Sequence, residues 1–117
     1  MLKVWGMHMI TLRPGVKAED FEKFLTTDVA KMPMYAGWNV HLLKGERGER
    51  KGQYVVLFEI DSLEARNRYS PTPDKMSPEA DQFGKAHPEL AGVFEKWGSL
   101  ATVPGESTNY TDYVEVG

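Results

Sequence analysis

The chain lacks cysteine altogether, and none of its apolar runs is long enough to cross a bilayer. Without cysteine there can be no disulfide, no thiolate nucleophile and no cysteine-bound zinc. A membrane-spanning helix needs about 20 consecutive apolar residues, so we expect no membrane partner. The 14 basic and 17 acidic residues are interspersed, unlike the basic stripe of a protein that binds nucleic acid. We therefore expect a cytoplasmic protein without a nucleic acid partner and, at 117 residues, one domain over positions 1–117.

Two segments, residues 1–12 and 53–60, alternate as strands do and are apolar on both faces. Their large apolar side chains divide into Val4, Ile10 and Leu12 opposite Trp5, Met7 and Met9, and Tyr54, Val56, Phe58 and Ile60 opposite Val55 and Leu57. Side chains alternate across a strand, so each apolar face needs its own cover. We expect helices to cover one face, with Met7 and Met9 packed against them. A second copy of the chain or a bound ligand would cover the other face.

Apolar periodicity and turn residues predict four strands with helices between them. In the first half of the chain we expect a strand over Leu2–Leu12, a helix over Ala18–Lys31, and strands over Trp38–Lys44 and Gln53–Ile60 joined by the loop Gly45–Gly52. A helix over Leu63–Tyr69 follows, capped by Asp61 or Ser62, and then the loop Ser70–Ser77. Helical segments from Pro78 and over Pro88–Trp97 lead through the connection Gly98–Ser107 to a last strand over Thr108–Val116. This β-α-β-β-α-β order predicts a ferredoxin-like α+β fold, a four-stranded antiparallel sheet with its helices on one face.

The chain resembles the dimeric α+β barrel superfamily in three respects: the order of its elements, its length, and the turn at residues 12–16 (Leu-Arg-Pro-Gly-Val) followed by Glu-Asp-Phe at 19–21. In that superfamily two ferredoxin-like sheets face each other in a homodimer, and each subunit has a cavity between its sheet and its helices. Members include cofactor-independent monooxygenases, heme-degrading monooxygenases, polyketide cyclases and stress-responsive proteins. The resemblance implies a homodimer and a small hydrophobic or aromatic ligand, but one fold hosts many functions.

Three positions carry over from this resemblance. His8 stands where heme-degrading members have a strand-one asparagine and polyketide cyclases a histidine. Tyr69 stands where the monooxygenases have a tryptophan and the cyclases a tyrosine. Residues 83–87 (Phe-Gly-Lys-Ala-His) resemble the Phe-x-x-Ala-His segment that carries the proximal histidine of the heme-degrading branch. This chain departs from the pattern because Pro88 follows that histidine and the strand-one asparagine is missing.

His8, Tyr69 and His87 are therefore the candidate catalytic residues. A neutral imidazole at His8 could act as general base, or could be a hydrogen-bonded core histidine. The Tyr69 hydroxyl could donate to a substrate carbonyl or enolate, or could simply point its tip into water. His87 could be a second cavity histidine, an axial heme ligand or a helix cap. With His41 the chain has three scattered histidines without nearby paired carboxylates, so we predict no metal and no bound cofactor.

The resemblance to the superfamily implies a cofactor-independent monooxygenase or cyclase that acts on a small phenolic or polyketide-like compound. In this hypothesis His8 removes or holds a proton and Tyr69 binds the developing oxyanion. A non-catalytic small-molecule-binding or stress-associated dimeric module would use the same cavity without turnover. A heme-binding protein with His87 as axial ligand is a further alternative. The sequence leaves open whether the chain is an enzyme.

Overall fold

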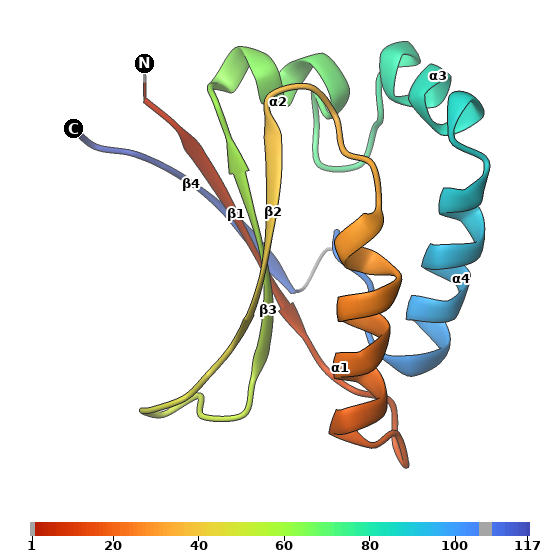
Figure 1. Ribbon diagram of the computed structural model, residues 1–117. Helices are drawn as coiled ribbons and strands as arrows, with labels where there is room; N and C mark the ends of the chain where they lie inside the picture. The colour runs from red at the N-terminus through yellow and green to blue at the C-terminus, as the bar shows by residue number, and fades with distance from the viewer. Residues whose placement is uncertain (1, 106–108) are drawn as a thin grey trace.

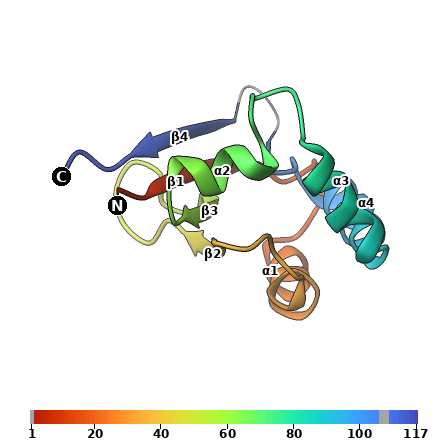
Figure 2. The same cartoon turned by 90° about the horizontal axis from the view of Figure 1, so that it is seen from above.

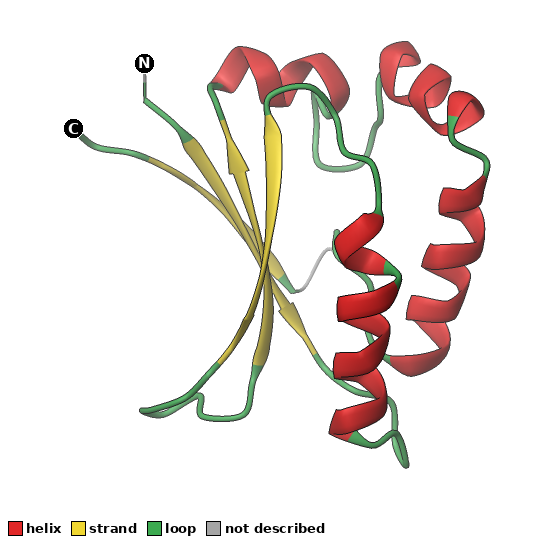
Figure 3. Cartoon of the chain, in the orientation of Figure 1, coloured by secondary structure: helices red, strands yellow, loops and turns green. Residues whose placement is uncertain are grey.

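The computed structural model describes residues 2–105 and 109–117. Its strands are β1 (Val4–Ile10), β2 (Trp38–Lys44), β3 (Tyr54–Ile60) and β4 (Tyr110–Val114), and its helices are α1 (Ala18–Thr27), the short 3₁₀ helix η1 (Val29–Lys31), α2 (Leu63–Tyr69), α3 (Pro78–Ala86) and α4 (Glu89–Leu100). The four strands form one antiparallel sheet in the order β2-β3-β1-β4. This α+β arrangement, coloured by element type in Figure 3, is compatible with a ferredoxin-like fold.

Both long helices lie against the same face of the sheet. Figure 1 shows α1 and α4 packed beside each other in front of this face, whereas α2 and α3 lie across one end of the molecule. The view from above in Figure 2 also places α1 and α4 on one side of the sheet. The expectation of a single helical face is thereby confirmed. Within the described ranges, no helix is long and apolar enough to cross a membrane.

The core lies between this helix face and the helices. The apolar stripe of α1 buries Phe21 and Phe24, which are 0% and 2% exposed, and both rings contact Trp97 of α4 edge-on. Trp97 itself is 1% exposed, and its Nε1–H donates to the carbonyl oxygen of Thr102 at 2.9 Å. Because the apolar body is buried and the one polar atom is satisfied, Trp97 anchors α4 to α1. Ile10 of β1 belongs to the same cluster.

The strand register decides which residues face the helices. Along β1 the even-numbered residues from Val4 to Ile10 are buried, and the odd-numbered residues are only half-buried. Met7 pairs with Leu57 of β3 on the face that the helices leave open. The expectation that Met7 and Met9 pack against the helices is therefore wrong. The alternation shows which side chains share a face of the strand, but it does not show which face the helices cover. The helices cover the face that carries Ile10, because Ile10 packs into the aromatic core.

Most element boundaries follow the local signals. Ser62 Oγ accepts from the backbone N–H of Ala65 at 3.1 Å and so caps α2, and Ser77 caps α3 in the same way. The helix expected to reach residue 31 breaks at Asp28 into α1 and η1. Helix α4 continues to Leu100, inside the expected connection 98–107. Residues 106–108, which belong to the expected connection and the start of the expected last strand, lie outside the described residues.

Candidate functional site

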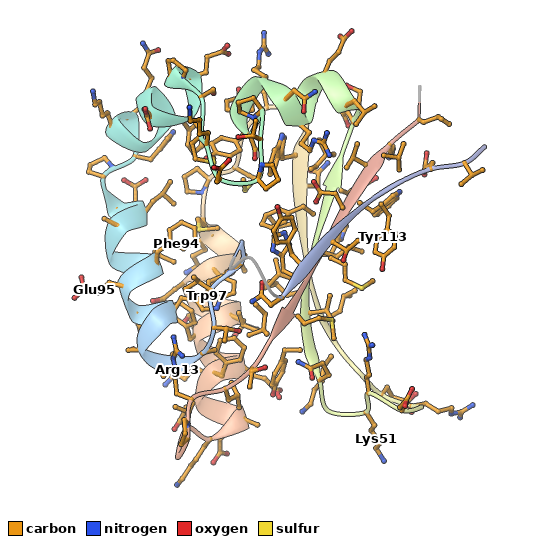
Figure 4. All side chains as sticks on the ribbon, turned by 180° about the vertical axis from the view of Figure 1, so that it is seen from behind. Arg13, Lys51, Phe94, Glu95, Trp97 and Tyr113 are labelled. Carbon is orange, nitrogen blue, oxygen red and sulfur yellow. The ribbon has the colours of Figure 1, made fainter. Side chains whose placement is uncertain are left out.

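A cavity of about 390 Å³ lies between the helix face of the sheet and the layer formed by α4, α2 and the segments after η1 and α2. Its lining is mainly apolar, and its aromatic members are Tyr35, Trp38, Phe58, Phe94, Trp97 and Tyr110. Figure 4 shows Phe94 and Trp97 on the side of α4 that faces the sheet, whereas Glu95 points away. Cavities of this size and character are typical of small-molecule sites.

His8 lies in the floor of this cavity and is only 7% exposed. The backbone N–H of Gly105 donates to His8 Nδ1 at 2.8 Å. The imidazole stacks on the Tyr110 ring, with centroids 4.9 Å apart and planes 10° apart, and meets the Phe58 ring edge-on. Gly105 has a φ of +93°, a backbone conformation that favours glycine. The ring of His8 is therefore held in one orientation.

The hydrogen bond to Nδ1 fixes the tautomer of His8. Because Nδ1 accepts, a neutral His8 carries its proton on Nε2 and can only donate from that atom. Burial lowers the pKa of His8 from its ordinary 6.5 to about 4, against the opposing effect of the Asp112 carboxylate. His8 is thus a neutral hydrogen-bond donor at pH 7. Its one lone pair is already engaged by Gly105, which does not suit the general-base role expected from the sequence.

The second polar group of the cavity is Asp112 of β4. Its Oδ2 accepts from Arg66 of α2 at 3.1 Å, and the two side chains are about one-quarter exposed. Among the described residues these are the only charged side chains in the cavity lining. Neither residue was a candidate from the sequence, because the two are 46 positions apart and lie on different elements. The alternation of β4, which puts Asp112 on the same face as Tyr110, was the available signal.

Tyr69 is buried behind the cavity wall. Its ring stacks on that of Tyr35, with centroids 4.2 Å apart and planes 6° apart, and Tyr35 rather than Tyr69 lines the cavity. Burial, together with Tyr69 and Asp81, raises the pKa of the Tyr35 phenol. Tyr69 therefore supports an aromatic wall, and the structure does not bring its side chain together with His8 in the lining.

His87 and His41 both lie away from the cavity. His87 is the C-terminal cap residue of α3; its ring contacts Phe83, and its Nδ1 is 3.4 Å from a Glu89 carboxylate oxygen. His41 is on the open face of the sheet, 3.0 Å from Glu59. In the part of the chain that the structure describes, no three metal-ligating side chains converge. Of the three candidate residues, only His8 contributes to the cavity lining.

No known family model, curated protein or solved structure gives a significant match to this chain. The function is therefore inferred from the chemistry of the site, because a fold by itself does not specify a reaction.

Proposed function

We propose that this protein is a small-molecule enzyme acting on a phenolic or enolisable, polyketide-like compound inside a homodimeric α+β barrel. The observation that carries the proposal is the convergence of two different polar groups in one apolar cavity. The N–H of His8 and the carboxylate of Asp112 both face a space of about 390 Å³. A few convergent polar groups in an apolar pocket are what an active site requires.

The two groups divide the chemistry between them. Asp112 accepts the proton from an acidic C–H or O–H bond of the substrate, and the electron pair stays on the substrate as an enolate or phenolate. The Nε2–H of His8 then donates to the oxygen on which this charge develops. Such a donor is worth more in an apolar site than in water, because no solvent competes with it. Arg66 binds the other oxygen of Asp112 and fixes the direction of the carboxylate.

The enolate can react further in two ways, which correspond to the cyclase and the monooxygenase expected from the sequence. It can attack a carbonyl carbon of the same molecule, which closes a ring; the new alkoxide takes back the proton that Asp112 accepted, so no further reactant is needed. It can also react with dioxygen as co-substrate: one oxygen atom enters the substrate, the other leaves as water, and the substrate supplies the two electrons by its own oxidation to a quinone, which would make the protein a monooxygenase. Both outcomes start from the same proton transfer, so the proposed roles of His8 and Asp112 are common to them.

A homodimer would explain the open face of the sheet. Met7 and Leu57 lie near the middle of this face and are only half-buried within the chain. At one end of the face, Lys3 pairs with Glu59, and Trp5 Nε1–H donates to Glu115 at 3.1 Å. An apolar centre with a polar rim is the usual anatomy of a protein interface. In the proposed barrel, a second copy presents the same face.

Turnover of enolisable aromatic polyketide-like compounds by the purified protein tests the enzyme proposal. We expect His8→Ala and Asp112→Asn each to reduce turnover by at least about 100-fold, because one oxyanion donor and one general base each contribute about this much. Asp20→Asn, an equal change at an exposed position in α1, is the matched control and should retain full activity. Unchanged turnover in both site variants would contradict the assignment.

A binding module without turnover is the second candidate. The observation that favours it is that Tyr69 and His87 lie outside the cavity lining, so only one of the three residues expected to be catalytic faces the cavity. In this case a ligand would bind tightly and leave chemically unchanged. Chromatography of the ligand recovered after incubation distinguishes the two candidates.

A further inference from the structure

Gly6 lies in the cavity floor between the two polar groups of the site. A Cβ atom at this position would be 3.0 Å from Asp112 Oδ1, 3.5 Å from His8 Nε2 and 3.6 Å from Phe58 Cβ. In the sheet register Gly6 is the neighbour of Phe58 on one side and Asp112 on the other, and His8 follows it on the same face of β1. Because Gly6 has no side chain, a ligand atom can approach the strand between a donor and an acceptor.

The donor and the acceptor demand different things of a ligand. His8 Nε2 carries a hydrogen, because Nδ1 accepts from Gly105. Asp112 Oδ1 is a carboxylate oxygen that accepts, while the other oxygen of this carboxylate binds Arg66. In the described part of the chain no hydrogen bond joins His8 to Asp112 directly. A hydroxyl group satisfies both atoms, because it accepts from one and donates to the other, whereas an ether or a carbonyl oxygen can only accept.

We infer that Gly6, His8 and Asp112 form a hydroxyl cradle that selects planar ligands bearing a phenolic or enolic O–H. This inference rests on the proposed function and specifies its substrate class. The ligand enters hydroxyl first, and its ring lies among the aromatic lining that begins with Phe58 and Tyr110. A ligand that lacks the hydroxyl leaves the Asp112 carboxylate facing apolar surface, which is why discrimination is expected.

Three compounds with the same ring system test the cradle by isothermal titration calorimetry. They are 2-naphthol, which donates and accepts; 2-methoxynaphthalene, which only accepts; and naphthalene, which does neither. We expect the wild-type protein to bind 2-naphthol at least about tenfold more tightly than 2-methoxynaphthalene, since one hydrogen bond to a charged group separates them.

Gly6→Ala puts a methyl group into the cradle. In this variant 2-naphthol and 2-methoxynaphthalene should bind with about equal affinity, and the affinity for naphthalene should change little. Gly84→Ala, in α3, is the matched control, because a Cβ there meets nothing within 4 Å. It should keep the wild-type preference. Asp112→Leu removes the acceptor without a change at Gly6, and should also abolish the preference. It decides the matter should Gly6→Ala fail to fold.

The outcomes separate the inference from the proposed function. Equal affinity of the wild-type protein for all three compounds overturns the cradle and leaves the cavity function standing. A preference for 2-naphthol that persists in both Gly6→Ala and Asp112→Leu also overturns the cradle. Binding of none of the three compounds overturns the proposed function and the cradle together. A preference present in the wild type and in Gly84→Ala, and lost in the two cradle variants, supports the inference.

Discussion

Acidification from pH 7 to pH 5 is expected to destabilise this protein through a single buried residue, His8. The folded chain holds His8 neutral, with a pKa of about 4 instead of 6.5. The unfolded chain takes up the proton near pH 6.5, so below that pH it binds more protons than the folded chain. The free energy of unfolding must therefore fall as the pH falls, by up to about 1.4 kcal/mol per pH unit. Between pH 7 and pH 5 the integrated loss is about 2 kcal/mol.

Urea denaturation at pH 7 and pH 5 measures this loss, with His8→Gln as the matched control. The glutamine amide oxygen can still accept from the Gly105 N–H, but it does not titrate. Other groups respond at lower pH: the hydrogen bond from Lys3 lowers the pKa of Glu59 below 4.5, and its stabilisation is lost only as pH falls through that range. The wild type should lose about 2 kcal/mol more than the variant.

Nitrogen chemical shifts of the imidazole report the protonation state and the tautomer of His8 directly. We expect the Nε2–H tautomer of His8 across the neutral range, because Nδ1 accepts from Gly105. Equal acid sensitivity of the wild type and His8→Gln, or a His8 pKa near 6.5, would refute the reasoning that burial and this hydrogen bond keep the ring neutral.

Three further substitutions have definite expected outcomes. Trp97→Ala should cost about 4 kcal/mol in urea denaturation, whereas Phe94→Ala, at a residue 41% exposed, should cost less than half as much. Gly105→Ala should cost about 1–2 kcal/mol, because its φ of +93° strains any other residue, and it should shift the His8 imidazole resonances; unaltered resonances would contradict the contact. Arg66→Met should raise the pKa of His8 in an NMR titration, because the neighbouring carboxylate loses its cation, and a lowered pKa would contradict this.

Local signals were sufficient to predict most of the elements. The turn residues on either side predicted the bounds of β2 to the residue, and the cap at Ser62 and the Ser77–Pro78 pair gave the starts of α2 and α3. The extension of α4 to Leu100 was not predicted, because Gly98 resembles a helix end although the Trp97 anchor continues the helix past it. Tertiary packing overrides such local preferences.

The candidate site was predictable only where one strand carries it. Alternation indicates that His8 shares a face of β1 with Ile10, but both faces of this strand are apolar, so only the structure shows that the helices cover the face of His8. Arg66 of α2 and Asp112 of β4 are 46 positions apart in the sequence, and no sequence pattern shows that these two side chains meet. The role of His8 also depends on Gly105, whose N–H occupies the lone pair that a general base would need. From the sequence alone His8 could act as a donor or as a base, and only the hydrogen-bond partner of Nδ1 distinguishes the two roles.

A crystal structure of the protein with 2-naphthol would show directly whether a planar compound with a hydroxyl group binds in the cavity between His8 and Asp112. We expect the naphthol oxygen above Gly6, within hydrogen-bond distance of His8 Nε2 and of an Asp112 carboxylate oxygen. Electron density for 2-naphthol elsewhere on the protein, or in the cavity with its hydroxyl turned away from both atoms, would overturn the proposed mode of binding.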